Sequence, residues 1–345
     1  MTTLTVLKIL LMMGGTFILI KASNIVVHGL NRLAETAHWG KFGIAALILA
    51  LSTSLPELSV GITAAINKTP ALSLGDVVGS NVANISLVMG GAALISGSVA
   101  VIGSYLKRDF ILAFLAGSLP LLLLMDGKLG RIDGLILLSA YGYYLFSVVH
   151  KKHVKAMRAD KEGLMGRFLR RFKVLKRVSV RESMAQVMLG MGLLLFSAQI
   201  IVRLATQIAT DLHMPVLLVG LFMVAIGTSL PELVLATKAI AEKEVALVFG
   251  NLLGSTVANS TLIIGLVAVL SPIEIVAVRS YLLATIAYII LFWLFWLFTK
   301  TKKRLDRWEG ALLLVGYLLF LGLELVKENG WGLWLPDWFQ WILGR

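Results

Sequence analysis

The sequence predicts an all-α polytopic membrane protein with ten transmembrane helices, arranged as two inverted five-helix repeats. Three observations support this fold class. Hydrophobic residues make up 58% of the 345 positions and charged residues only 15%, whereas soluble domains carry roughly 25% charged residues. Long apolar stretches recur along the chain, without the short alternating stretches of a membrane barrel. A stretch of 32 residues also occurs twice, at a constant offset of 175 positions.

The apolar stretches fall into two sets of five, separated by one hydrophilic loop. Because each set holds an odd number of spans, the second set crosses the membrane in the direction opposite to the first. We expect spans near residues 5–30, 42–66, 72–99, 105–125, 132–150, 184–210, 214–240, 246–270, 278–299 and 309–326. The resulting division is a first repeat at 1–150 with its motif at 50–90, a basic loop at 151–182, a second repeat at 183–326 with its motif at 225–265, and a Trp-rich tail at 327–345.

The central loop, residues 151–182, carries twelve Lys and Arg against three acidic residues. Since Lys- and Arg-rich loops stay in the cytoplasm, we place this loop inside the cell and both termini outside, in a multi-pass protein of the cell (inner) membrane. The basic cluster at 300–307 then also falls on the cytoplasmic side. The loop is either a basic amphipathic helix on the anionic lipid leaflet or a solvated linker that fixes topology. The tail at 327–345 is expected at the membrane interface, where tryptophans concentrate.

Composition also excludes several functions. The net charge of +13 lies mainly in segments beside the spans, so a nucleic-acid partner is not expected. The absence of cysteine excludes a disulfide framework, a thiol nucleophile and a thiolate metal site. No HExxH, GxSxG or paired-aspartate motif lies on a span, so we do not expect an enzyme, and no cofactor is implied.

The repeated stretch places one glutamate of each copy, Glu57 or Glu232, inside an apolar span. The copies read TSLPELSVGITAAINKTPALSLGDVVGSNVAN and TSLPELVLATKAIAEKEVALVFGNLLGSTVAN, and 16 of their 32 positions are identical. Burying an unneeded carboxylate at membrane depth costs at least about 2.5 kcal/mol. A duplication kept for packing alone would keep small and apolar residues, whereas these copies also share Thr, Ser, Glu and Asn. We therefore favour a polar transport path over buried acids that only brace helices.

Each glutamate follows a proline, Pro56 or Pro231. Proline cannot donate to the carbonyl group four residues earlier, so the backbone near residues 52–54 and 227–229 is expected to present free carbonyl oxygens. Irregular backbone is tolerated at membrane depth only where it is buried or lines a cavity. Four hydroxyl-bearing residues lie within one helical turn of the glutamates, namely Thr53, Ser54, Thr228 and Ser229.

The second half of each copy adds oxygen ligands spaced four residues apart, on one helical face. Hard oxygen atoms suit Na⁺, Ca²⁺ or Mg²⁺ and not zinc or copper, and Mg²⁺ is disfavoured because it dehydrates reluctantly. The two glutamates carry a charge of −2, which one Ca²⁺ or two Na⁺ would balance. The added ligands are Asp76, Ser80 and Asn84 in the first copy, and Asn251, Ser255 and Asn259 in the second.

At these residues the chain resembles the calcium/cation antiporter superfamily, and most closely the microbial sodium/calcium exchangers. The family pattern is GTSLPE followed by GNxxGSN, present twice in inverted order, and the resemblance covers essentially the whole chain. It implies an antiporter that uses the Na⁺ gradient to move Ca²⁺ outward. The ligands that it implies are Glu57 and Glu232 at the centre, completed by Asn84 and Asn259; the carbonyls of Thr53 and Thr228 on Ca²⁺; Ser54, Ser80 and the Ala50 carbonyl at one flanking Na⁺ site; and Ser229, Ser255 and the Ala225 carbonyl at the other.

Three positions depart from this family pattern. Ser52 stands where Gly is usual, which is a mild change. Asp76 stands where Asn is usual, and we expect it to add an acid near the mouth of the site. Asn259 replaces an Asp that some members carry, which leaves two carboxylates at the centre instead of three. These departures leave K⁺ co-transport and the stoichiometry open.

Two other transport functions fit part of the pattern. A Ca²⁺/H⁺ or K⁺-dependent antiporter of the same superfamily would use the same glutamates, since a carboxylate can also carry a proton, but the many hydroxyl and carbonyl oxygens favour Na⁺. A cation channel needs a continuous pore, commonly built by rotational symmetry of subunits, whereas an inverted repeat suits alternating access. The expected partners are therefore Ca²⁺, Na⁺ and membrane lipid.

Overall fold

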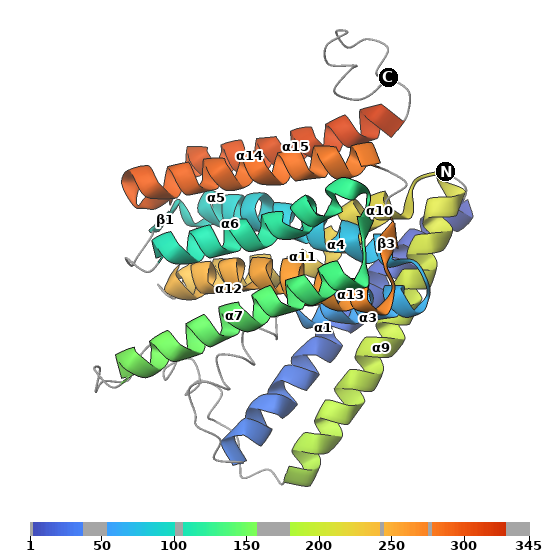
Figure 1. The fold of residues 1–345 in the computed structure, drawn as a ribbon, viewed down its shortest axis with the longest axis horizontal. Coiled ribbons are helices and arrows are strands. Elements are labelled where there is room, and N and C mark those ends of the chain that lie inside the picture. The colour runs from blue at the N-terminus through green and yellow to red at the C-terminus, as the bar shows by residue number, and fades with distance from the viewer. Residues whose placement is uncertain are drawn as a thin grey trace.

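The computed structural model describes residues 3–36, 54–100, 106–156, 180–241, 245–274 and 278–328, and within them the chain is almost wholly helical (Figure 1). The helices of the first half are α1 (Thr3–Thr36), α3 (Leu55–Ile66), α4 (Pro70–Ala83), η1 (Asn84–Val88), α5 (Met89–Ser96), α6 (Leu106–Leu123), η2 (Leu124–Asp126) and α7 (Arg131–Ala156). Those of the second half are α9 (Val180–Asp211), α10 (Val216–Val219), η3 (Gly220–Val224), α11 (Ala225–Ala241), α12 (Val245–Val257), η4 (Ala258–Ile263), α13 (Ile264–Leu270), α14 (Val278–Lys302) and α15 (Arg307–Glu328).

Seven described segments are long and apolar enough to cross a membrane, and each coincides within a few residues with a predicted span. They are Leu4–Gly29, Pro70–Ser96, Arg108–Asp126, Arg181–Asp211, Val216–Ala241, Val248–Leu270 and Tyr281–Lys302. Large apolar side chains such as Leu10, Phe17 and Phe196 point outward from these helices, as lipid-facing side chains do. The protein is therefore an all-helical, multi-pass membrane protein. The three other predicted spans, 42–66, 132–150 and 309–326, overlap α3, α7 and α15, which are not among these seven segments, and residues 42–53 lie outside the described residues.

The two segments that carry the second halves of the repeated stretch lie at the centre of the molecule. In one 18-residue window of each segment, 78% of the residues of Pro70–Ser96 and 83% of those of Val248–Leu270 are buried, against 28–59% in the other five segments. Glycines bring α4 against backbone: a Cβ atom at Gly75 would overlap the carbonyl oxygen of Leu217, and one at Gly79 that of Leu221. The helix α4 therefore packs directly on α10 and η3, which belong to the other repeat.

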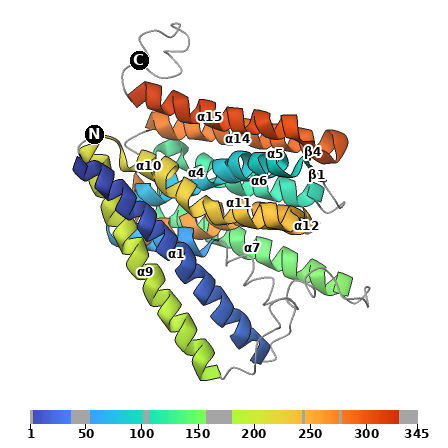
Figure 2. The same ribbon diagram turned by 180° about the vertical axis from the view of Figure 1, so that it is seen from behind.

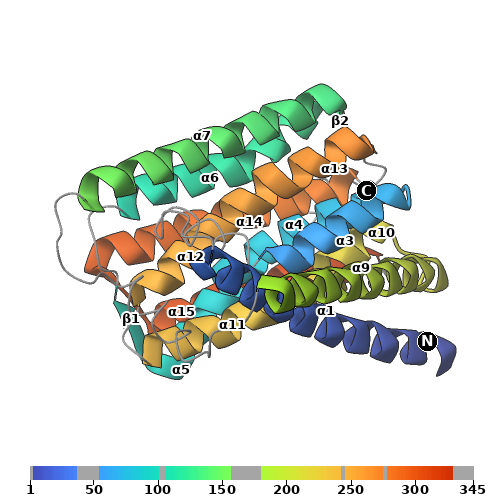
Figure 3. The same ribbon diagram turned by 90° about the horizontal axis from the view of Figure 1, so that it is seen from below.

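Four short strands, which the sequence did not predict, pair loops of one half with loops of the other. β1 (Ser98–Ala100) pairs antiparallel with β4 (Arg304–Asp306), and β2 (Lys128–Leu129) pairs antiparallel with β3 (Ile273–Glu274). β1 and β3 begin 175 positions apart, the offset of the repeated stretch. The two small sheets lie at opposite ends of the helices (Figure 1, Figure 3). This placement is expected if one half is inverted relative to the other.

The helices α1 and α9 form a long pair that leans away from the remaining helices (Figure 2). Their buried apolar side chains belong to a cluster separate from the main core. The pair is tied near both ends. Lys8 Nζ lies 2.6 Å from Asp211 Oδ2 at one end, and Arg32 Nη1 donates to Gln186 Oε1 at 3.0 Å at the other. α1 and α9 are thus joined to each other more extensively than to the rest of the fold.

Candidate ion-binding site

In the first copy, Glu57 lies in the first turn of α3. This helix begins at Leu55, directly after Ser54, so Pro56 occupies an early position where a proline costs no helical hydrogen bond. The proline therefore starts the described helix instead of interrupting it. The Glu57 side chain is only 1% exposed, and neither of its carboxylate oxygens has a hydrogen-bond partner among the described residues.

In the second copy, Glu232 lies within the continuous helix α11, directly after Pro231. Since proline has no N–H group, the Gly227 carbonyl lacks its usual helical donor, as the sequence predicts. Glu232 is 3% exposed, and its Oε2 atom has no hydrogen-bond partner within the described part of the chain. The helix is preceded by the π-helical turn η3, so Ala225 stands at the change from π- to α-helix.

The helix α4 connects the two copies through Thr228 of α11. The Thr228 Oγ1 atom donates to Asp76 Oδ1 at 3.2 Å and lies 3.2 Å from Ser80 Oγ. Asp76 is fully buried, so the expectation that it stands near the mouth of the site is wrong. Helical spacing placed Asp76 on the correct face of α4, but its depth depends on α11, which packs over it.

Both copies carry a π-helical turn at a predicted asparagine ligand. Asn84 begins η1, and Asn259, 175 positions later, lies in η4. A π turn inserts one extra residue into the helical ladder and is common at functional sites because it redirects side chains. The Oδ1 atoms of both asparagines are buried and have no hydrogen-bond partner in the described ranges. The apolar pattern of the sequence does not indicate these π turns, and only the matched asparagines pointed to their positions.

The acidic groups of the two copies act on one another. Glu57 interacts electrostatically with both Glu232 and Asp76, and Glu232 interacts with Asp76. A small cavity beside them is lined by Asn84, Glu232 and Asn251, with apolar side chains around these three. Its volume is about 10 Å³, which is roughly the space that one water molecule needs. Buried acidic side chains of both copies thus lie near one another, and the cavity at Glu232 has room for a small ion.

Of the other predicted ligands, four lie within the described residues and two lie outside them. Ser54, Ser229, Ser255 and Ala225 are buried, and the first two have hydroxyl oxygens without a partner among the described residues. The Ser255 hydroxyl donates to the Leu252 carbonyl of its own helix. Ala50 and Thr53, and the greater part of the basic loop and the Trp-rich tail, lie outside the described residues. Within the described ranges no three His, Cys, Asp or Glu side chains gather around one point, so a bound ion would also need hydroxyl, amide and carbonyl oxygens.

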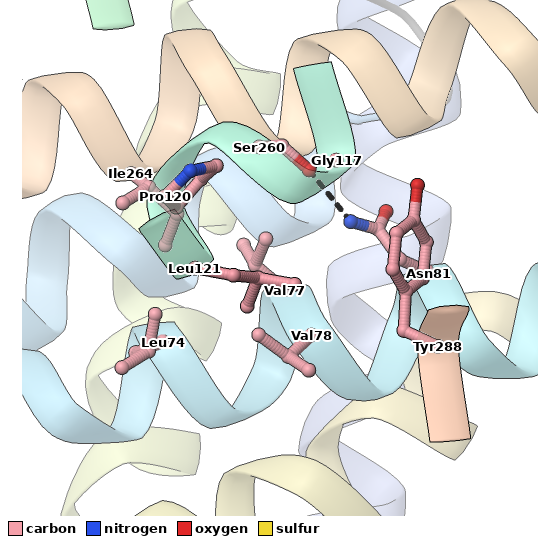
Figure 4. Close-up of a pocket in the computed structure, with 10 residues that line it drawn as sticks. All are labelled: Leu74, Val77, Val78, Asn81, Gly117, Pro120, Leu121, Ser260, Ile264 and Tyr288. Atoms are coloured by element: carbon pink, nitrogen blue, oxygen red, sulfur yellow. Dashed lines mark hydrogen bonds between the residues drawn. The ribbon is translucent and has the colours of Figure 1, made fainter. Parts of the chain in front are cut away.

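A second polar contact, which the sequence analysis missed, holds α4 against η4. Asn81 Nδ2 donates to Ser260 Oγ at 2.7 Å, beside a small cavity also lined by Gly117 and Tyr288 (Figure 4). The Tyr288 hydroxyl donates to the Ala113 carbonyl at 3.3 Å. None of the predicted ligands lines this cavity. Ser260 belongs to the π turn η4 and Asn81 lies in α4 just before η1, so this hydrogen bond joins the two regions that carry Asn259 and Asn84.

Comparison with known proteins gives consistent matches over the whole length. The profile of the sodium/calcium exchanger protein family matches residues 7–149 and 182–326. The chain is 30% identical over 327 residues to the inner membrane protein YrbG of Escherichia coli (strain K12), covering 90% of this chain and 97% of YrbG. It is 27% identical over 346 residues to the sodium/calcium exchanger MaX1 of Methanosarcina acetivorans, covering 92% of this chain and 98% of MaX1.

The fold also matches solved structures. The sodium-calcium exchanger NCX_Mj, soaked with 2.5 mM Na⁺ and 0.1 mM Ca²⁺, superposes with a TM-score of 0.57 at 28% sequence identity, covering 93% of this chain and 99% of that chain. A second NCX_Mj structure, soaked with 100 mM Na⁺ and 10 mM Sr²⁺, gives a TM-score of 0.57 at 27% identity, with the same coverage. The described chain thus has an NCX_Mj-like fold that contains two repeats of the family.

Proposed function

Because this chain belongs to the sodium/calcium exchanger protein family, whose members are transporters and not enzymes, we propose that it is a secondary active antiporter exchanging Na⁺ for Ca²⁺. Exchange proceeds by alternating access around the oxygen-lined centre between α3, α4, α11 and α12. MaX1 and NCX_Mj, which resemble this chain over most of its length, are both named sodium/calcium exchangers. Their names support the choice of ions.

The observation that carries this proposal is a set of buried oxygen atoms, contributed by both copies, without hydrogen-bond donors. Leaving a buried acceptor unpaired costs about 1–3 kcal/mol, and more for a charged group. A cation pairs many such acceptors at once, whereas apolar packing pairs none. Among the proposed ligands, the atoms without a partner in the described residues are Ser54 Oγ, both Glu57 carboxylate oxygens, Asp76 Oδ2, Asn84 Oδ1, Ser229 Oγ, Glu232 Oε2 and Asn259 Oδ1.

The proposed ligand roles follow the resemblance and the geometry together. Glu57 and Glu232 are the shared central ligands, and Asn84 and Asn259 complete the centre from the two π turns. The carbonyls of Thr53 and Thr228 are proposed as further Ca²⁺ ligands. One flanking Na⁺ site is formed by Ser54, Ser80 and the Ala50 carbonyl. The other is formed by Ser229, Ser255 and the Ala225 carbonyl.

The proposed movement is a sliding of the α1–α9 pair against the remaining helices. The pair has its own apolar cluster, while β1–β4 and β2–β3 tie the other loops of the two halves together at both ends. Gly15 contacts Ile201 and Gly190 contacts Val26 at matching positions within the pair, and these contacts let its two helices pack closely and move as one body. Gly14 and Gly192 have no atom within 4 Å of their Cβ positions, so neither adds a sliding contact.

The architecture proposed is ten transmembrane spans in two inverted halves, 1–150 and 183–326, with the basic loop 151–182 in the cytoplasm. Both described ends support it: α1 begins and α15 ends at the end of the molecule opposite β1 (Figure 1). The relative YrbG is an inner membrane protein, and we propose the inner membrane for this chain as well.

Ca²⁺ uptake into Na⁺-loaded proteoliposomes tests the function. We expect ⁴⁵Ca²⁺ to accumulate in the vesicles when the outside medium is Na⁺-free. The uptake should stop when the Na⁺ concentration is equal on both sides, and it should need neither K⁺ nor a pH gradient. The Glu57→Gln variant is the inactive control. Uptake that follows a pH gradient in Na⁺-free vesicles would show a Ca²⁺/H⁺ antiporter instead, uptake that requires K⁺ would show a K⁺-dependent exchanger, and steady flux with choline on both sides would show a channel.

A further inference from the structure

The placement of Asp76 gives this ion centre a third carboxylate. Asp76 is fully buried, and its Oδ1 atom accepts the hydrogen bond from Thr228 while its Oδ2 atom has no partner among the described residues. It interacts electrostatically with both central glutamates. A third buried acidic side chain, on α4, is therefore joined to the other repeat through Thr228 of α11, although the sequence placed only two acids at the centre.

The Thr228 hydroxyl lies between Asp76 and Ser80, two residues of α4 on the same helical face. Ser80 Oγ lies 3.2 Å from Thr228 Oγ1, and Thr228 Oγ1 donates to Asp76 Oδ1 at 3.2 Å. Hydrogen bonds that end on a carboxylate are stronger when the carboxylate is charged. The free Oδ2 atom remains available for a cation. Asp76 thus has both the charge and the unpaired oxygen of an ion ligand.

The second repeat shows that this acid is specific to one half of the site. The residue equivalent to Asp76, 175 positions later, is Asn251, which lines the small cavity with Glu232 and Asn84. Asn84 and Asn259, the equivalent residues on the two π turns, are neutral in both copies. The second halves of the two copies therefore differ by one negative charge, at position 76.

We propose that Asp76 is the third charged ligand of the ion centre and sets how many monovalent cations it holds. This inference rests on the proposed function. Buried charges must be compensated, so Glu57 and Glu232 alone accommodate one Ca²⁺ or a matching pair of Na⁺. With Asp76, the centre accommodates one more Na⁺ than the two glutamates neutralise.

Equilibrium binding of ²²Na⁺ to the purified protein in detergent, without Ca²⁺, measures this number directly. The test variant is Asp76→Asn, which keeps the shape and retains an oxygen to accept the hydrogen bond from Thr228. We expect it to bind about one Na⁺ fewer per protein at saturation than the unmodified chain, and to show a less steep dependence on Na⁺ concentration. The matched control is Asp133→Asn in the first turn of α7, where the acid only accepts the Gly130 N–H group, and its Na⁺ count stays unchanged.

A double variant, Asp76→Asn with Asn259→Asp, moves the charge from α4 to the π turn η4 of the other repeat. We expect it to bind the same number of Na⁺ as the unmodified protein, and it carries the test if Asp76→Asn alone does not fold. An unchanged Na⁺ count in folded Asp76→Asn, or a reduced count in the folded double variant, overturns the proposal. Counting bound Na⁺ does not require exchange, so a failure of Na⁺-driven Ca²⁺ uptake would reject the proposed function separately.

Discussion

Replacing Glu57 by Gln removes one charge from the ion centre while keeping the size of the side chain. Glu57 is 1% exposed, and neither carboxylate oxygen has a hydrogen-bond partner among the described residues. Its charged neighbours, Glu232 and Asp76, are themselves acidic, so a cation is the group that can balance its charge. Removing one member of a buried charge pair costs about 3–5 kcal/mol. We therefore expect Ca²⁺ affinity to fall by at least about 100-fold.

Binding of ⁴⁵Ca²⁺ and thermal unfolding of the purified variant measure this loss. Ca²⁺ at about 100 times its dissociation constant stabilises a protein by about 2.7 kcal/mol, and we expect that stabilisation in the unmodified chain only. In the absence of ions, the variant loses the repulsion from Glu232 and Asp76. Its unfolding temperature should then equal or exceed that of the unmodified protein, which separates a lost ligand from a misfolded chain.

The matched control is Glu309→Gln, which changes another buried glutamate, outside the repeated stretch. Glu309 is 2% exposed in the first turn of α15 and accepts the Asp306 N–H group at 2.8 Å, a bond that the Gln oxygen can keep. Its Ca²⁺ affinity should be unchanged. If Glu57→Gln, or the equivalent Glu232→Gln, bound Ca²⁺ within about threefold of the unmodified protein, the reasoning from buried charge would be refuted.

Three further predictions test the movement, the packing and one pH effect. Asn67 at the end of α3 and Gln199 of α9 are joined by two side-chain hydrogen bonds of 2.9 and 3.2 Å. A disulfide formed in the double variant Asn67→Cys/Gln199→Cys should therefore stop Ca²⁺ transport until reductant is added. Ca²⁺ transport by the fully cross-linked protein would contradict the sliding of α9. Gly75→Ala should lower the unfolding temperature, because overpacking typically costs about 1–3 kcal/mol, while Gly192→Ala, with no atom within 4 Å, should not. A hydrogen bond from Lys128 lowers the pKa of Glu274, so the pair stabilises the fold above the unfolded pKa of Glu274 and this contribution is lost as the pH falls through the folded value. Glu274→Gln should accordingly lower the unfolding temperature at neutral pH but not in acid. An equal loss of unfolding temperature at both pH values would show that the Lys128–Glu274 pair does not stabilise the fold in this way.

The class of the protein and the positions of its helices could be predicted from sequence because both depend on local properties. A stretch of about twenty apolar residues is a candidate membrane span wherever it occurs, and the seven apolar segments fall on predicted spans. The two glutamates could also be singled out without a structure, since an acid in an apolar span is costly in any fold. Recurrence at a fixed offset then showed that Glu57 and Glu232 are equivalent.

Only the tertiary structure decided how deep each polar residue lies and which residues meet across the repeats. Periodicity gives the face of a helix but not what covers it, so Asp76 was expected at the mouth and is instead enclosed beside Thr228. The pairing of Ser98–Ala100 with Arg304–Asp306 joins segments about two hundred residues apart, a non-local contact that no local propensity encodes. The π turns at Asn84 and Asn259 likewise change the backbone without changing the apolar pattern, because one inserted residue does not alter which residues are apolar.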